Sequence, residues 1–166
     1  IRDVLGSRGL GDVYKRQRRQ NFMIESDTIK LLRECDAGIK MGVASIEDVL
    51  DYVSNTDLKK HLDRCKNDHE KLENQIQLLL DKYHDDGKDP NAMAKSMSWL
   101  KTNMKLAVNE SDGTVADLIT DGCNMGVKSL SRYLNQYKAA DETSKQITKR
   151  LIELEEHLAH SVRPFL

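Results

Sequence analysis

The side chains best suited to chemistry lie in the last amphipathic stretch of the chain, residues 144–165. Glu153, Glu156, His157 and His160 run beside its apolar positions. Carboxylates and imidazoles on facing helices are the side chains from which metal sites in helical bundles are built. The pattern leaves two alternatives, one half of a metal site or a hydrated flank of a bundle, and the choice between them decides the function.

Another histidine, His69, stands on an apolar seam between Asp68 and Glu70. A histidine at such a position is either a hydrogen-bonded core residue or a ligand. We interpret His69 as the best single candidate for chemistry in the chain. The seam repeats at steps of four and three and consists of Leu58, Leu62, Cys65, His69, Leu72, Ile76, Leu79 and Tyr83.

Two acids on other predicted helices are further candidate ligands. Asp36 interrupts an otherwise apolar seam, and Asp121 falls on a polar stripe. Each also has a simpler interpretation, Asp36 as a carboxylate that reaches water at the edge of the seam and Asp121 as a residue of a solvent-facing surface. The predicted metal ligands are therefore His69, Asp121, Glu153, His157 and His160, with Asp36 as an additional candidate.

Long amphipathic helices must position these side chains, because apolar residues recur every three or four positions along most of the chain. Two pairs of helices with short links, joined by one long central connection, describe an all-α, ferritin-like four-helix bundle. We expect a short helical crossover, which carries Trp99, between the second and third long helices. The pattern predicts long helices at residues 27–53, 56–83, 114–137 and 142–163, and the crossover helix at 93–108.

Two pairs of glycines fall inside the predicted helices, Gly38 with Gly42 and Gly122 with Gly126. Each glycine costs about 1 kcal/mol relative to alanine in a helix interior. We expect the first pair to permit a close helix contact. The second pair leaves room for a neighbouring backbone or a bulky side chain such as Trp99.

The composition restricts the class of protein. With 166 residues, 32% charged and 5% aromatic side chains and two prolines, the chain suits one domain of long helices better than a sandwich or a barrel. No apolar run is long enough to span a bilayer, and no secretory segment is present. The three cysteines show no CxxC spacing, so we expect reduced, partly buried thiols in a cytoplasmic protein.

The sequence also lacks the usual signatures of an enzyme. It contains no glycine-rich phosphate loop and no nucleophile elbow, so acyl transfer and hydrolysis have no support. No small-molecule substrate can be identified from it. We therefore expect a protein that is not an enzyme.

Residues 1–22 do not share the helical pattern. Their string DVLGSRGLGDVYKRQ resembles a translated sequencing adapter, and Arg18-Arg19 can be encoded by a bacterial ribosome-binding sequence ahead of Met23. We expect a disordered, non-native leader before a bacterial protein that starts at Met23; the alternative is a basic arm for nucleic acid. Without the leader, the 26 basic and 27 acidic residues become 20 and 25, and a net charge near −5 argues against nucleic-acid binding.

Four stretches carry a resemblance to a known family: LLRECDAGIKMGV, NDHEKLENQIQLLLDKY, AKSMSWLKTNMKLAV and DLITDGCNMGVKSLSRYL. By their order and spacing, residues 23–166 resemble an uncharacterised bacterial family of ferritin-like four-helix bundles. Ferritin-like di-iron proteins take a carboxylate from each of two helices and a Glu-x-x-His pair from each of the other two. This resemblance therefore implies where a metal centre would lie.

The sequence departs from that ligand pattern. The second helix offers Lys66-x-x-His69 and the last offers His157-x-x-His160, while Gly38 and Gly126 align near the expected carboxylates. We therefore expect an incomplete di-iron site, no cofactor, and a non-catalytic bundle that acts by protein interaction or by self-association as a homo-oligomer. The alternative is a protein that binds iron or another divalent metal in metal storage or an oxidative-stress response.

Overall fold

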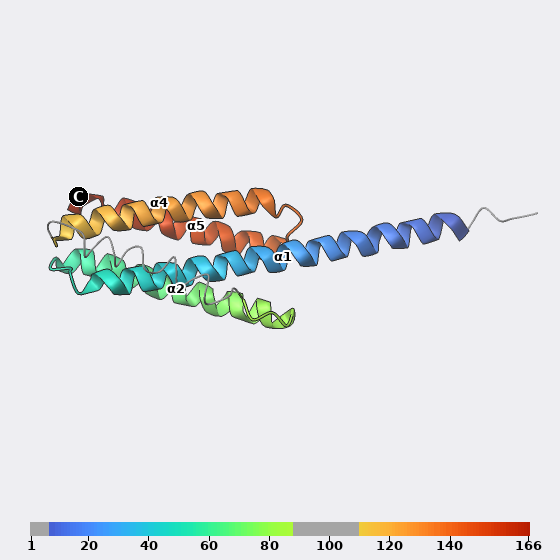
Figure 1. The fold of residues 1–166 in the computed structure, drawn as a ribbon, viewed down its shortest axis with the longest axis horizontal. Coiled ribbons are helices and arrows are strands. Elements are labelled where there is room, and N and C mark those ends of the chain that lie inside the picture. The colour runs from blue at the N-terminus through green and yellow to red at the C-terminus, as the bar shows by residue number, and fades with distance from the viewer. Residues whose placement is uncertain (1–6, 88–109) are drawn as a thin grey trace, which may run out of the picture.

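The computed structural model describes residues 7–87 and 110–166, and within these ranges all regular secondary structure is helical. The four long helices agree with an all-α bundle, which confirms the predicted fold class at this level (Figure 1). A short 3-10 helix, η1, follows the last of them. The elements are α1 (Ser7–Leu50), α2 (Thr56–Lys82), α4 (Asp112–Gln136), α5 (Glu142–Val162) and η1 (Arg163–Phe165).

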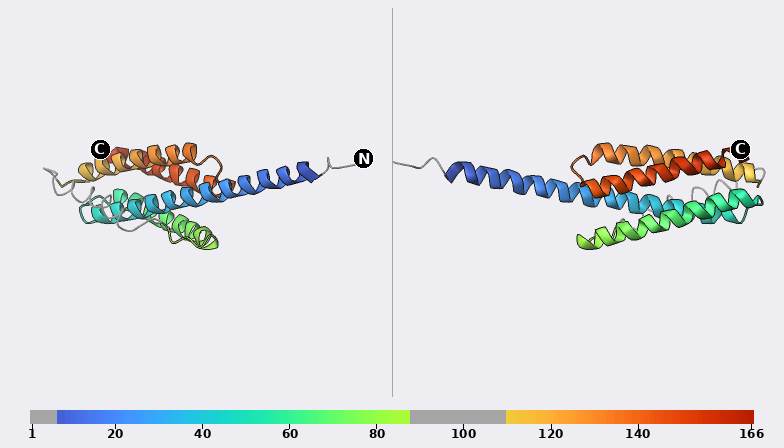
Figure 2. Two further views of the ribbon diagram at one scale, coloured as in Figure 1. Left: turned by 45° about the vertical axis from the view of Figure 1, so that its right-hand side comes forward. Right: turned by 180° about the vertical axis from the view of Figure 1, so that it is seen from behind.

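The helices form two antiparallel hairpins that pack against each other. α1 lies beside α2, and α4 lies beside α5, in all the views of Figures 1 and 2. α1 also packs on α4, and α2 on α5, and these pairs are antiparallel as well; α1 further contacts α5 across the bundle, and these two helices run in the same direction. α2 and α4 run in the same direction along the bundle. The predicted crossover helix 93–108 lies outside the described residues.

Side-chain caps fix the N-terminal ends of α2, α4 and α5, the three helices whose bounds the sequence predicts well. The Asn55 side chain accepts hydrogen bonds from the backbone N–H groups of Asp57 and Leu58, and so begins α2. Ser111 and Asp141 cap α4 and α5 in the same way. The observed bounds of these three helices therefore lie within two residues of the predicted ones.

The start of α1 differs from the prediction. The sequence favours a cap at Ser26 or Asp27 after a disordered leader, but the helix already begins at Ser7 and projects beyond the bundle (Figure 1). Asp27 Oδ2 instead accepts the backbone N–H of Ala139 at 3.0 Å, and Thr28 Oγ1 accepts that of Asp141 at 2.9 Å. Asp27, which the sequence favours as a cap, thus instead connects α1 to the turn between α4 and α5. No proline interrupts the preceding residues, so the helix continues backwards through them.

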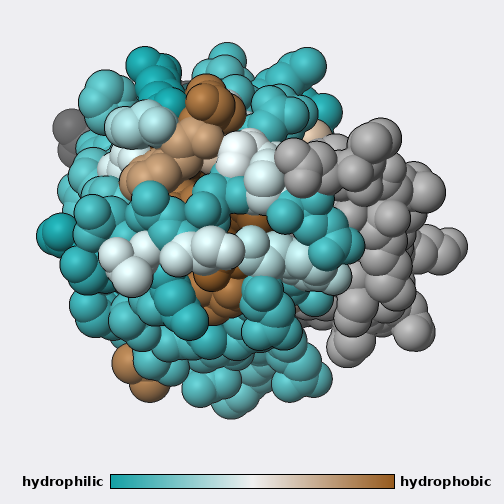
Figure 3. All heavy atoms as spheres, turned by 90° about the vertical axis from the view of Figure 1, so that its left-hand side faces the viewer, coloured by the Kyte–Doolittle hydropathy of each residue, from teal (hydrophilic) through white to brown (hydrophobic). Residues whose placement is uncertain are grey.

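Two apolar clusters fill the interior of the bundle. The first includes Ile46, Leu58 and Val162 and lies toward the end where α1 leads into α2. The second includes Leu32 and Leu80 and lies toward the other end. Figure 3 looks onto the first end, where apolar side chains show in the middle of a largely hydrophilic surface.

No helix within residues 7–87 and 110–166 combines the length and the apolar character that crossing a membrane requires.

Candidate functional site

A buried ion pair joins α2 to α5 in the middle of the bundle. His69 Nε2 lies 3.0 Å from Glu155 Oε1, and the two residues are 1% and 9% exposed. The structure thus gives the seam histidine a partner that the sequence analysis did not name. Taking two charged groups out of water is costly unless they are paired and hydrogen-bonded. The pair is therefore the feature of the interior that most needs an explanation.

The hydrogen bond of the other ring nitrogen of His69 shows that this nitrogen carries a proton. Nδ1 lies 2.9 Å from the backbone carbonyl oxygen of Cys65, one turn earlier on α2. A carbonyl oxygen only accepts, so Nδ1–H must donate to it. The Cys65 thiol adds a contact of 3.4 Å to the same nitrogen. Both nitrogens are thus engaged, and the ring has none free for proton transfer to a substrate.

The surroundings of His69 favour its charged form. Burial alone would lower the pKa of the imidazole, but hydrogen bonds with Cys65 and Glu155 and the charge of Glu155 outweigh burial and raise the pKa to about 10. At neutral pH the pair is therefore an imidazolium that donates to a carboxylate. This state leaves no net charge in the core.

A second buried thiol lies against the same carboxylate. Cys123 of α4 hydrogen-bonds to the Glu155 side chain, and burial together with the Glu155 charge raises the pKa of the thiol far above its usual value. Only the thiolate is a good nucleophile, so this cysteine is chemically inert at neutral pH. Within the described residues all three cysteines are free and buried, as expected from their spacing.

Small residues on the remaining two helices make room for the pair. A Cβ atom on Gly42 of α1 would lie 3.2 Å from His69 Nε2, and one on Gly126 of α4 would lie 3.4 Å from the Glu155 carboxyl carbon. These four residues form one layer, with one member from each helix, between the two apolar clusters. We call Gly42, His69, Gly126 and Glu155 the central layer.

A cavity of about 490 Å³ opens between α1 and α4 onto the central layer. Gly38 and Ala37 of α1, and Gly122 and Ser129 of α4, belong to its small-residue walls. A Cβ atom on Gly38 or Gly122 would meet nothing within 4 Å. In each glycine pair one member, Gly38 or Gly122, therefore leaves open space along the α1–α4 face, while the other, Gly42 or Gly126, permits the close contact expected from the sequence. The bulky neighbour considered for this space, Trp99, lies outside the described residues.

Asp36 has a structural role in the fold. It is fully buried, with Oδ2 2.8 Å from Lys40 Nζ and Oδ1 2.7 Å from Gln77 Nε2. The expectation that this carboxylate reaches water is wrong, because two donors from α1 and α2 replace the solvent. Gly87 packs against the Asp36 carboxylate in a left-handed conformation, with φ 85°. A Cβ atom at this position would lie 2.7 Å from Asp36 Oδ2.

The other predicted metal ligands do not join His69. Asp121, Glu153, His157 and His160 are all exposed, on α4 and α5. No group of three or more His, Cys, Asp or Glu side chains in the described parts of the chain is arranged to hold a metal ion. Metal binding by these residues stays a prediction, without a cluster in residues 7–87 and 110–166 to support it.

Comparison of the chain with models of known families, with curated protein sequences and with solved structures gave no match.

Proposed function

We propose that the chain is a non-catalytic four-helix bundle of ferritin-like arrangement that binds a small, largely apolar molecule between α1 and α4. The cavity above the central layer carries this proposal. Its volume of about 490 Å³ lies in the range of small-molecule sites, which are mostly apolar with a few fixed polar groups. A ligand bound there would lie on the side chains of Ile119 and Leu130 and reach the Glu155 carboxylate.

The polar end of such a ligand would be a hydrogen-bond donor. A carboxylate offers about four acceptor positions, and the Glu155 carboxylate uses two of them, one at Oε1 for His69 and one for the Cys123 thiol. Its other oxygen, Oε2, would lie 3.6 Å from a Cβ atom on Gly126, so this oxygen faces the glycine of α4. A hydroxyl or amine group of the ligand could donate to it without displacing the ion pair.

Two features support a ferritin-like, non-catalytic protein. α2 and α4 run in the same direction, as the second and third helices do when a long crossover joins them. Ligand and metal sites of bundles are built from side chains of facing helices at mid-core, where the central layer lies. Here His69 has both nitrogens engaged and Cys123 is held as a thiol. Self-association and divalent-metal binding stay predictions.

A substitution that fills the cavity tests this function. Leucine in place of Gly122 enters open space, whereas leucine in place of Gly11 alters an exposed helical glycine far along α1. The probe is the uncharged dye N-phenyl-1-naphthylamine, whose fluorescence rises in apolar surroundings. We expect the full chain to bind it saturably, and Gly122→Leu to lower the affinity about tenfold, equivalent to about 1.4 kcal/mol. Gly11→Leu serves as the control and should leave binding unchanged.

Equal binding by the wild type and Gly122→Leu would contradict the proposal, as would absence of saturable binding. Circular dichroism of each variant establishes that the helices are retained.

A further inference from the structure

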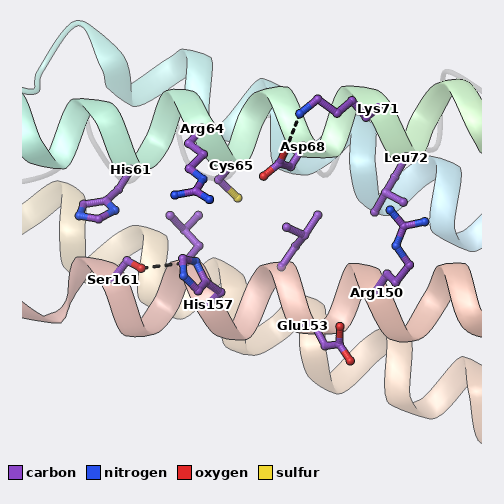
Figure 4. A pocket seen from close by; sticks show the side chains of 12 residues that line it. His61, Arg64, Cys65, Asp68, Lys71, Leu72, Arg150, Glu153, His157 and Ser161 are labelled. Carbon is purple, nitrogen blue, oxygen red and sulfur yellow. Dashed lines mark hydrogen bonds and ion pairs between the residues drawn. The ribbon is translucent and has the colours of Figure 1, made fainter.

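A second hollow, with a volume of about 440 Å³, lies between α2 and α5 (Figure 4). Its floor is apolar and includes Leu72 and Leu158. Its rim is rich in cationic and ionisable groups from both helices. The rim residues are His61, Arg64, Asp68 and Lys71 of α2 and Arg150, Glu153, His157 and Ser161 of α5. We call this hollow the α2–α5 groove.

The spacing of these groups places basic side chains on both walls of the groove. Arg64 and Lys71 are seven residues apart on α2, and Arg150 and His157 are seven apart on α5. Because the two helices are antiparallel, Arg64 lies opposite His157, and Arg150 extends toward Leu72 of α2, while the Lys71 side chain runs along α2 toward Asp68 (Figure 4). Figure 4 shows the Arg64 side chain extending from α2 toward His157. The guanidinium groups of Arg64 and Arg150 therefore enter the groove from its two opposite walls.

The groove supplies too few carboxylates to neutralise its cations. Lys71 Nζ lies 2.8 Å from Asp68 Oδ1, and Arg64 also interacts with Asp68 and contributes to the lowered pKa of that carboxyl. Arg150 Nη1 donates to the neutral Gln75 amide at 3.2 Å. Glu153, the other acid of the rim, points away from α2 in Figure 4. Three permanent cations therefore share one carboxylate over the groove.

We infer that the α2–α5 groove binds a small organic phosphate. Guanidinium groups match the geometry and charge of phosphate oxygens, and Arg64 and Arg150 offer two of them. Seven helical residues span about 10 Å, so the cations extend along a groove long enough for a phosphate and an attached body. The apolar floor at Leu72 and Leu158 would contact that body. This site opens on the α2–α5 face, whereas the first cavity opens between α1 and α4; Leu158 lines both hollows from opposite sides, and the charged rim belongs to the groove alone.

A titration of the full chain with phenyl phosphate tests the inference. Side-chain N–H resonances of Arg64 and Arg150 in ¹H–¹⁵N spectra should shift saturably. Phenyl phosphate should bind more tightly than inorganic phosphate because of the apolar floor, and phenol should not produce these shifts. The double variant Arg64→Gln/Arg150→Gln should lower the affinity at least about fivefold, a loss in line with an exposed ion pair.

The matched control is Lys59→Gln/Lys149→Gln, which removes two positive charges from the same two helices outside the groove. It should retain the affinity of the wild type. An equal loss in both double variants would mean that only overall charge matters and would overturn the inference, as would the absence of saturable shifts. Equal affinity for inorganic phosphate and phenyl phosphate would show that the groove does not bind the organic body of the ligand, and would overturn that part of the inference.

Discussion

His69 and Glu155, 86 positions apart in the chain, meet at 3.0 Å in the centre of the bundle and are its only buried histidine–carboxylate pair among the described residues. They divide the interior into two apolar clusters, one toward each end. The bundle therefore depends on this pair being complete, since Glu155 alone would be a buried charge without a counterion, and His69 alone would lose its charge-assisted hydrogen bond and with it the extra proton.

Removing one partner should be far worse than removing both. Glu155→Gln removes the counter-charge of His69, so the buried ring either stays unpaired or gives up its proton and the ion pair is lost, and we expect the free energy of unfolding to fall by about 3 kcal/mol. His69→Leu/Glu155→Leu replaces both by apolar side chains and should recover most of that loss. Urea unfolding measures each value, with the exposed Glu156→Gln as a control that changes it by less than about 0.5 kcal/mol. A double variant that is no more stable than Glu155→Gln would contradict the coupling between the two side chains.

The stability should fall as the pH rises above neutrality. The pKa of His69 is raised from 6.5 to about 10, so the folded chain keeps a proton that the unfolded chain loses. This contribution is fully present below pH 6.5 and is lost as the pH approaches 10, with a slope of at most about 1.4 kcal/mol per pH unit. Urea unfolding between pH 6 and 10 measures it. The slope should be smaller in His69→Leu/Glu155→Leu, and identical slopes would refute the assignment.

Two glycines one turn apart on α1 should respond oppositely to alanine. Gly38→Ala places its methyl in open space and gains helix propensity, so we expect stabilisation by up to about 1 kcal/mol. Gly42→Ala places a methyl 3.2 Å from His69 Nε2. His69 is held by hydrogen bonds on both nitrogens and cannot move aside, so we expect destabilisation. Thermal unfolding of both variants gives the comparison, and equal stabilisation would show that the central layer is not tightly packed.

Two hydroxyl groups of α5 offer another matched pair. Ser144 Oγ is buried without a hydrogen-bond partner among the described residues, so Ser144→Ala should stabilise the chain by about 1 kcal/mol. Thr148 Oγ1 donates to the Ser144 carbonyl oxygen and contacts Cys35 Sγ at 3.2 Å. Thr148→Val should therefore destabilise it by about 1 kcal/mol. Denaturant unfolding measures both changes, and a stabilising Thr148→Val would argue against these contacts.

The sequence predicts the helices better than it predicts the site. The seam of α2 is largely confirmed, including the burial of His69, with Leu80 buried in place of Leu79. Glu155 was missed because Leu154 already satisfied the apolar repeat of α5. Yet Glu155 lies four residues after Leu151 and three before Leu158, so helical spacing alone allowed it to face inward.

The same one-residue ambiguity affects α4. The spacing of apolar and small residues in 114–137 predicts an inward-facing Gly122, three residues after Ile119, whereas the structure buries Cys123 and leaves Gly122 exposed beside the cavity. Which of two adjacent positions faces the core depends on the rotation of the helix in the assembled bundle. That rotation is set by contacts with the other helices, and the periodicity of a single helix does not specify it.

The two hairpins divide the central layer between them. Gly42 and His69 belong to the α1–α2 half, and Gly126 and Glu155 belong to the α4–α5 half. Each half contains local contacts that close within a short span of chain, whereas the ion pair forms only when the halves meet. The protonation state of His69 is thus a natural reporter of late assembly, since a half-formed bundle would hold an ordinary imidazole.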